Sequence, residues 1–215
     1  MNKWIDKKTF ISLLKDGQSI MFGGFLACGT PEVLVDWILE SKVKDLTLIG
    51  NDAGWPTKGI GKLIANNQVK KLIASHIGTN PEAGKRMHDQ TLEVELVPQG
   101  SLIEKIRAFG AGLGGILTPT GFKTIAEDHK RLIEVQGKTY ILEEPIGADL
   151  AIVEAREADD LGNLVYDKTA RNFNPIIATA AKTVVAYTFK HVSHIDPECV
   201  VTPHVFVDYL VKEEK

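Results

Sequence analysis

The sequence predicts an α/β fold, with a mainly parallel sheet, flanking helices and a β-hairpin insertion. Short apolar runs alternate with helical patterns over the first two-thirds of the chain. This alternation is typical of strand–helix–strand units joined by right-handed crossovers. From Lys130 the pattern changes to short β-rich runs around the tight turn Gln136-Gly137, which predicts an antiparallel hairpin. We expect a single domain over residues 1–215, because no low-complexity tract or polar linker divides the chain.

The elements follow in order along the chain. In the first half the predicted strands cover 20–24, 46–50, 72–75 and 92–97, and the predicted helices cover 31–41, 59–66, 81–88 and 101–109. Two of these helices begin alike, with Thr30-Pro31-Glu32 and Asn80-Pro81-Glu82. Each start offers a capping residue, a proline suited to the first helical position and an acid in the first turn. The later predictions are a hairpin of 131–135 and 139–143, strands at 149–154, 163–166 and 183–189, and a helix from Asn174-Pro175 through Ala181.

Composition narrows the class of protein. Hydrophobic residues at 44% and charged residues at 25% are typical of a globular chain with a sizeable core. A net charge of −3 gives no argument for nucleic-acid binding. No apolar run approaches the roughly 18 residues of a membrane span, and residues 1–15 lack the apolar region of a signal peptide. Since Cys28 and Cys199 imply no disulfide framework, we expect a cytoplasmic protein.

The segment 16–31 is the most informative stretch. It predicts a turn, a short strand, a glycine-rich loop and a helix that opens at Thr30 and Pro31. Paired glycines at Gly23-Gly24 suit a sharp bend or a close approach of the backbone to another group. We expect the loop to aim backbone N–H groups at a site that favours negative charge. The alternative is a tight strand-to-helix turn without a ligand.

The segment also resembles the signature of the family I coenzyme A transferases, in their alpha-type half. The matching positions are Asp16-Gly17, Ile20-Met21-Phe22, Gly23-Gly24-Phe25, Gly29 and Pro31. The resemblance continues through Asn51-Asp52, 74–80, 97–100, 110–112, 118–121 and 170–174, and so covers nearly all of the chain. Within the family it is most similar to the alpha subunit of the acetate/acetoacetate/butyrate type.

The resemblance implies an enzyme that moves CoA between a short-chain acyl-CoA (acetoacetyl-, acetyl- or butyryl-CoA) and a carboxylate such as acetate. Such reactions belong to short-chain fatty acid and ketone body metabolism. They proceed by a ping-pong mechanism on a glutamate nucleophile, which the family carries in its beta-type half. Its motif is not found in this chain. The resemblance therefore implies a beta subunit, in a heterodimer or a larger α2β2 or α4β4 complex. Coenzyme A is then a substrate, and no cofactor or metal is expected.

Gln99 is the predicted catalytic residue. It follows a predicted strand and a proline, at the sheet edge where α/β proteins bind ligands. Its amide could polarise the acyl oxygen, although a glutamine that only satisfies a turn is the alternative. The resemblance favours the acyl site. The predicted substrate-binding residues are Gly23, Gly24, Phe25, Gly29, Asn51, His76 and Gly112.

Other motifs have plainer interpretations. The glycines at 110–115 have the spacing of a dinucleotide-binding fingerprint. A predicted helix precedes them, however, where that fingerprint needs a strand. His191 and His194 lack a third zinc ligand at suitable spacing. Cys28 is interpreted as a packed small residue rather than a nucleophile. Arg171 suits either a carboxylate or phosphate, or a surface or subunit salt bridge.

Two rival functions remain open from the sequence. A sugar-phosphate isomerase-like enzyme shares a similar sheet architecture, but it would need a complete acid/base set in one chain. A non-catalytic protein that senses acyl-CoA would bind the ligand without turnover even with the beta subunit present.

Overall fold

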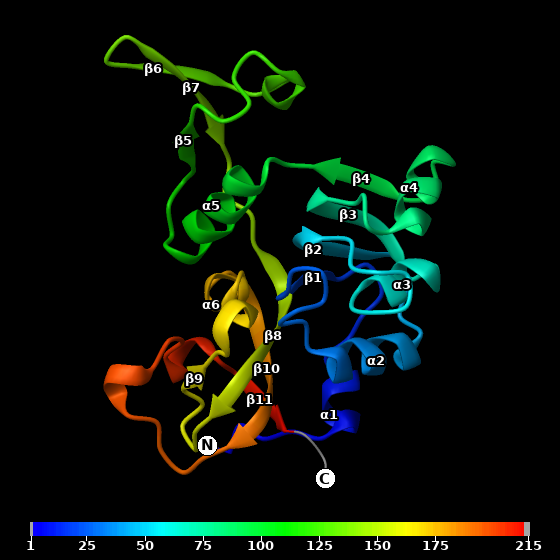
Figure 1. The fold of residues 1–215 in the computed structure, drawn as a ribbon, viewed down its shortest axis with the longest axis vertical. Helices are drawn as coiled ribbons and strands as arrows, with labels where there is room; N and C mark the ends of the chain where they lie inside the picture. The colour runs from blue at the N-terminus through cyan, green and yellow to red at the C-terminus, as the bar shows by residue number, and fades with distance from the viewer. Residues whose placement is uncertain (1, 213–215) are drawn as a thin grey trace.

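The structure, a computed structural model, describes residues 2–212. Within this range its main feature is an eight-stranded sheet (Figure 1). Seven strands run parallel in the order β11-β10-β8-β1-β2-β3-β4, and β9 pairs antiparallel with β8. The bounds are β1 Ser19–Phe22, β2 Leu46–Asp52, β3 Val69–His76, β4 Glu93–Leu96, β8 Ala148–Ala158, β9 Leu164–Val165, β10 Ala181–His191 and β11 Tyr209–Lys212. The predicted mainly parallel sheet is confirmed.

Helices cover both faces of this sheet. Figure 1 shows α1 to α4 on one side of it and α5 and α6 on the other. The α-helices are α1 Lys7–Ser12, α2 Glu32–Ser41, α3 Gly61–Ala65, α4 Pro81–His88, α5 Gln99–Gly110 and α6 Asn174–Ile177. Short 3-10 helices are η1 Ile125–Glu127, η2 Lys168–Arg171, η3 Pro197–Cys199 and η4 His204–Phe206. The sheet is therefore the middle layer of three.

Two apolar cores result, one on each face of the sheet. In β8, Leu150 and Ile152 join the core under α1 to α4, whereas Ala151 and Val153 join the core under α5 and α6. This division follows from the period of two along a strand. A strand buried on both faces is apolar at every position, which is why these segments appear in the sequence as continuous apolar runs.

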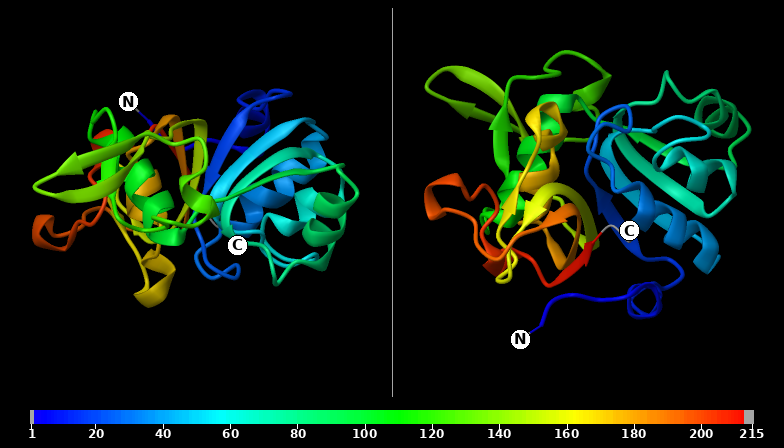
Figure 2. Two further views of the ribbon diagram at one scale, coloured as in Figure 1. Left: turned by 90° about the horizontal axis from the view of Figure 1, so that it is seen from above. Right: turned by 60° about the horizontal axis from the view of Figure 1, so that its bottom comes forward.

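A three-stranded antiparallel arm extends from the main sheet. It consists of β5 Ile116–Thr118, β6 Leu132–Val135 and β7 Lys138–Glu143, in the order β5-β7-β6. The hairpin of β6 and β7 projects beyond the sheet in both views of Figure 2. Its turn places Gln136 and Gly137 at φ of 50° and 72°, as a tight hairpin requires. The hairpin is confirmed, while β5 was not predicted.

A buried carboxylate fixes the base of the arm. Glu143 is 1% exposed and forms ion pairs with Lys130 at 2.6 Å and Lys105 of α5 at 3.3 Å. Removing either partner would leave a buried charge less well compensated, which is strongly destabilising. The arm is therefore tied to the helix that begins at Gln99.

Three helix starts differ from the sequence expectation, and one of them is that of α3, which begins at Gly61 rather than at Gly59. Thr30 does not cap α2, because its hydroxyl donates to the backbone oxygen of Gly23 at 3.0 Å. The helix begins instead at Glu32, after Pro31. Helix α5 begins at Gln99, two residues earlier than predicted. Strand β11, only four residues long, was not predicted either.

Candidate active site

A cavity of about 680 Å³ opens at the carboxyl ends of β2 and β3, on the side of α5 and α6. Such edges are where open α/β sheets bind ligands. Its lining comes from the loop after β1, from β2 and β3, from α5, and from the segment before α6. The lining residues are Phe25, Asn51, Ser75, Gln99, Ile103, Thr169, Asn172 and Phe173. We call this cavity the acyl pocket.

Three polar side chains lie on one side of the acyl pocket. The hydroxyl of Ser75 lies 2.7 Å from the backbone oxygen of Asn51 and 2.9 Å from its Oδ1. This orients the Asn51 amide, since its oxygen accepts from Ser75 and its Nδ2 remains available as a donor. Gln99 is the first residue of α5 and is exposed, and its amide bonds to no other residue of 2–212. Two amide donors are thus available beside one cavity.

Aromatic and aliphatic side chains form the rest of the wall. Phe25 is 46% exposed at the tip of the glycine loop, and Phe173 is buried at 3%. Ile103 lies one helical turn beyond Gln99 on α5 and packs against the same core. The pocket combines an apolar wall with a few directed polar groups, the usual composition of a small-molecule site.

Two asparagines at the start of α6, Asn172 just before the helix and Asn174 as its first residue, hold the glycine loop in place. Asn172 accepts from the Gly24 N–H at 3.0 Å and donates to the backbone oxygen of Cys28 at 2.8 Å. Asn174 is fully buried and donates to the backbone oxygens of Gly29 and Ala170, both at 2.8 Å. The predicted segment 170–174 therefore acts on the loop through its side-chain amides.

The glycines serve packing rather than anion binding. The N–H of Gly23 donates to the backbone oxygen of Ile152 at 3.1 Å, and that of Gly24 donates to Asn172. The N–H groups of Gly23 and Gly24 are therefore not available to an anionic ligand. A Cβ on Gly23 would lie 1.7 Å from Oδ1 of Asn174, and one on Gly29 would lie 2.5 Å from the backbone oxygen of Ala170. These positions need glycine because other chain segments pack directly on them.

Five predicted site residues do not line the acyl pocket: Gly23, Gly24, Gly29, His76 and Gly112. His76 ends β3 one position after Ser75, so strand alternation places its side chain on the opposite face. Gly112 follows the far end of α5, roughly 20 Å along the helix from Gln99 at 1.5 Å per residue. The structure brings Phe25, Asn51 and Gln99 together and leaves His76 and Gly112 apart from them.

Cys28 and Arg171 have environments that the sequence left open. Cys28 is exposed rather than packed, and its Sγ lies 3.7 Å from Oγ1 of Thr169. Arg171 lines a separate cavity of about 530 Å³, together with Arg156, Glu157 and other residues. Neither side chain lines the acyl pocket.

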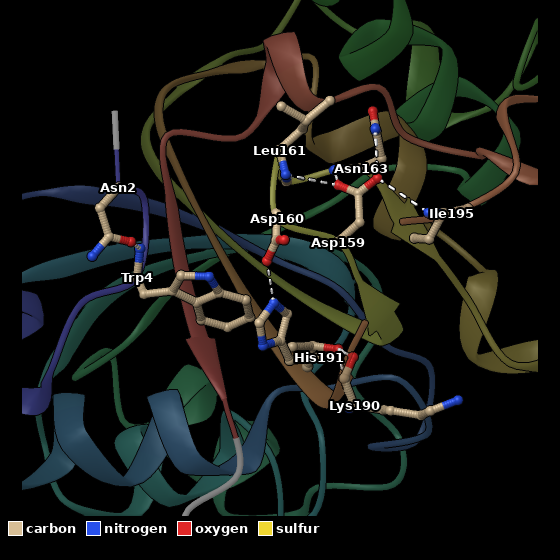
Figure 3. Close-up of polar contacts among 11 residues, drawn as sticks. Asn2, Trp4, Asp159, Asp160, Leu161, Asn163, Lys190, His191 and Ile195 are labelled. Carbon is tan, nitrogen blue, oxygen red and sulfur yellow. Dashed lines mark hydrogen bonds and ion pairs between the residues drawn. The ribbon is translucent and has the colours of Figure 1, made fainter. Parts of the chain in front are cut away.

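His191 makes one hydrogen bond and one aromatic contact. His191 ends β10, where its Nε2 lies 2.6 Å from Oδ1 of Asp160 and its ring lies 4.7 Å from that of Trp4 (Figure 3). Within residues 2–212, no group of three or more His, Cys, Asp or Glu side chains is placed to hold a metal ion. In the same range, no helix has the length and apolar character needed to cross a membrane.

One carboxyl near the glycine loop is unusual. Burial raises the pKa of Glu154 to about 7, the neighbouring carboxylate of Glu32 adds to the rise, and Lys58 opposes it. Glu154 follows Ile152 at a spacing of two on β8, so it faces the layer of α1 to α4, away from the acyl pocket. It is therefore no candidate for the missing nucleophile in that pocket.

The structural role of Asp52 was not predicted from the sequence. Asp52 ends β2 and is 2% exposed, and both of its carboxylate oxygens accept backbone N–H groups. One donor is Leu26 in the glycine loop, 26 residues earlier. No local pattern indicates a contact of this kind.

Comparison with known proteins identifies the family of this chain. The model of the Coenzyme A transferase family matches residues 7–213. The chain therefore belongs to the coenzyme A transferase family.

Its curated relatives narrow the position within that family. It is 51% identical over 204 residues to the acetoacetyl-CoA:acetate/butyrate CoA transferase alpha subunit of Clostridium acetobutylicum, and the match covers 94% of each chain. It is 50% identical over 203 residues to the acetate CoA-transferase subunit alpha of Escherichia coli K12, which covers 94% of this chain and 92% of the relative.

Solved structures share the fold. An acyl-CoA transferase of Escherichia coli O157:H7, in a thioester complex with CoA, matches with a TM-score of 0.87 at 21% identity. That match covers 99% of this chain and 47% of the other. Glutaconate coenzyme A-transferase of Acidaminococcus fermentans matches with a TM-score of 0.84 at 20% identity, over 98% and 75% of the two chains.

Proposed function

We propose that this chain is the alpha subunit of a heteromeric CoA-transferase that moves CoA between a short-chain acyl-CoA and a carboxylate such as acetate. The acyl pocket holds the acyl group, and a beta subunit supplies the nucleophilic glutamate. The names of the curated relatives, which are alpha subunits acting on acetoacetyl-CoA, acetate or butyrate, support this assignment.

The observation that carries the proposal is a pocket with polarising groups and no nucleophile. Its lining holds amides at Asn51, Gln99 and Asn172 but no carboxylate, cysteine or histidine. The hydroxyls of Ser75 and Thr169 are not paired with a histidine or carboxylate that could activate them. This lining supports the proposal that a second chain supplies the nucleophile.

The chemistry then divides between the two chains. A partner glutamate attacks the thioester carbonyl, the C–S bond breaks, and CoA leaves as a thiolate with a mixed anhydride on the enzyme. The thiolate attacks the glutamyl carbonyl of that anhydride, which releases the first carboxylate and leaves a glutamyl-CoA thioester. The acceptor acid reverses these steps and leaves as its CoA ester. In each attack, negative charge develops on a carbonyl oxygen, and the Gln99 and Asn51 amides can donate to it.

The residues of the lining also indicate which acyl groups the pocket can accept. None of its eight residues is Lys, Arg or His, so this lining offers no cation for the second carboxylate of a diacid or for a phosphate. Phe25, Ile103 and Phe173 offer an apolar wall instead. This favours short monocarboxylic acyl groups, and it disfavours a sugar phosphate as substrate.

Intact mass spectrometry of the complex tests the proposal. The chain is isolated from its host together with the chains that bind it, and the complex is incubated with acetoacetyl-CoA. We expect a partner chain to gain the mass of a CoA thioester, this chain to remain unmodified, and this chain alone to exchange no CoA. An adduct on this chain would contradict the division of labour. Binding of acetoacetyl-CoA by the complex with no adduct and no turnover would favour an acyl-CoA-sensing protein instead.

A further inference from the structure

Two loops with the same closing hydrogen bonds follow neighbouring strands. The loop of residues 24–29 follows β1 and the loop of residues 54–59 follows β2. Each is closed by a reciprocal pair of backbone hydrogen bonds, between Phe25 and Cys28 (3.0 and 2.9 Å) and between Trp55 and Lys58 (3.0 and 3.1 Å). Each also begins and ends with a glycine at positive φ. We call them the first and second loops.

The first loop carries local backbone strain at its tip. Leu26 and Ala27 have φ of 50° and 66°, in the left-handed region. For residues other than glycine this region costs roughly 1–2 kcal/mol each. Such a conformation persists only where surrounding contacts fix it. The contact partners of Leu26 and Ala27 therefore determine the position of the neighbouring Phe25.

Asp52 joins the two loops. Its Oδ2 accepts the N–H of Leu26 at 2.8 Å, and its Oδ1 accepts the N–H of Gly54 at 2.6 Å. The carboxylate is 2% exposed, so these bonds form away from water, where charge-assisted bonds are strong. One side chain thus holds the strained residue of the first loop against the start of the second.

The second loop also supports the first by packing. A Cβ on Gly59 would lie 3.3 Å from the Cβ of Ala27, so the two loops are in close contact at that point. The aromatic side chains of the two loops are similarly exposed, Phe25 at 46% and Trp55 at 41%. Only Phe25 lines the acyl pocket. The second loop is therefore a support for the first rather than a second wall.

We propose that Asp52 is a positioning residue, which holds Phe25 in place as a wall of the acyl pocket by clamping the first loop to the second. The proposal rests on the proposed function. Its consequence is that acyl-chain selectivity depends on a side chain that does not touch the substrate.

The kinetic test compares Asp52→Ala and Asp52→Asn in the complex with the beta subunit. Asp52→Ala removes both acceptors, and we expect kcat/KM with acetoacetyl-CoA to fall about 100-fold, since small displacements of positioning groups have effects of that size. Asp52→Asn retains one acceptor oxygen and turns an N–H donor toward the other loop, so a loss of about tenfold is expected. In both variants the ratio of kcat/KM for acetyl-CoA to that for butyryl-CoA should change.

Glu32→Gln is the matched control. Glu32 also accepts a backbone N–H, that of Gly59 at 2.7 Å, and of the two loops it bonds only to the second, its other partner being Lys62 of α3 at 2.6 Å. We expect its kcat/KM to stay within twofold of the parent, with the same acyl preference. If Asp52→Asn lowers the melting temperature but keeps the parent kcat/KM and acyl preference, its role is structural and the proposal is overturned.

Hydrogen–deuterium exchange tests the clamp independently of catalysis. In the complex, Asp52→Asn should speed exchange in peptides covering both loops, whereas Glu32→Gln should affect only the second. A response confined to one loop in Asp52→Asn contradicts the clamp. If the parent complex transfers no CoA, the proposed function fails, and the exchange result still decides whether Asp52 couples the loops. Should Asp52→Ala fail to fold, Asp52→Asn carries both tests.

Discussion

Asp52 and Asp159 are both buried carboxylates beside the end of a parallel strand, but they organise different kinds of structure. Asp159, 1% exposed, accepts the N–H groups of Leu161, Gly162 and Asn163 at 2.9 to 3.1 Å, all within its own turn (Figure 3). Asp52 instead joins two loops that belong to different strands. The first carboxylate completes its own turn and accepts one longer bond from outside it, from the N–H of Ile195 at 3.4 Å, whereas the second joins two loops and so positions a wall of the acyl pocket. We therefore expect changes near Asp52 to affect function and changes near Asp159 to affect stability.

The largest expected effect comes from breaking the long-range contacts at the acyl pocket, with Gly23→Ala. The new Cβ would lie 1.7 Å from Oδ1 of Asn174, which accepts the N–H of Glu154 at 3.0 Å. Overpacking together with the loss of this buried bond should lower the free energy of unfolding by about 4 kcal/mol. Urea unfolding measures it. Gly84→Ala on α4 is the control, because nothing lies within 4 Å of its Cβ and it should stabilise by roughly 0.5–1 kcal/mol.

Asp159→Ala tests the local side of the comparison. Besides the three turn N–H groups, Asp159 accepts from Nδ2 of Asn163 at 2.8 Å. The change therefore leaves several donors without an acceptor. We expect a loss of about 3 kcal/mol in the free energy of unfolding. Transfer activity per folded molecule should stay at the parent level. A fall in that activity comparable to the fall for Asp52→Ala would remove the distinction between the two carboxylates.

The pH dependence of Asp159 gives a further check on the same variant. Burial tends to raise its pKa, but the hydrogen bonds from Asn163 and the turn outweigh this and hold the pKa below the usual value. A lowered pKa stabilises the fold above the pKa of the unfolded chain, and this stability is lost as pH falls through the folded value. The stability difference between the parent and Asp159→Ala should therefore shrink in acid.

Gln99→Ala tests whether a change in the acyl pocket can lower transfer activity without lowering the stability of the fold. Gln99 is exposed at the start of α5 and its side-chain amide bonds to no other residue of 2–212, so the melting temperature should stay within a degree or two. Loss of one donor to a developing oxyanion should reduce kcat about 100-fold, with little change in KM. Gln99→Asn, which keeps a shorter amide, should recover part of the loss. An unchanged kcat would assign Gln99 to the turn, the alternative that its sequence position left open.

The same comparison explains how far the sequence could predict this protein. Periodicity and strand–helix alternation are local, so they predicted the parallel sheet and the hairpin. Gln99 and Asn51 were found because each follows or ends a predicted strand. The roles of Asp52, Asn172 and Asn174 depend on contacts 26 to 148 residues apart, which no local pattern encodes. Strand alternation could have separated His76 from Asn51, but only once their strands were placed in register.

Glu154→Gln is expected to have the smallest effect, and its sign depends on pH. The folded pKa of about 7 lies above the ordinary value of 4.5, because the side chain is largely buried beside Glu32 while Lys58 only partly offsets this. Between these two values the folded chain keeps a proton that the unfolded chain releases, so stability falls as pH rises through this window and is constant above it. The neutral glutamine removes that decline. We expect Glu154→Gln to match the parent near pH 4.5 and to exceed it near pH 8 by about 1–2 kcal/mol, after discounting for partial exposure to solvent.

Urea unfolding at the two pH values measures this difference. Glu134→Gln on β6, where the side chain is exposed, controls for the general effect of removing one negative charge, and its effect should be the same at both pH values within about 0.5 kcal/mol. Equal stability of Glu154→Gln and the parent near pH 8 would mean that water reaches the Glu154 carboxylate. The layer of α1 to α4 would then be open to water beneath the second loop, and the support that this loop gives to Phe25 would be weaker than its packing against Ala27 indicates.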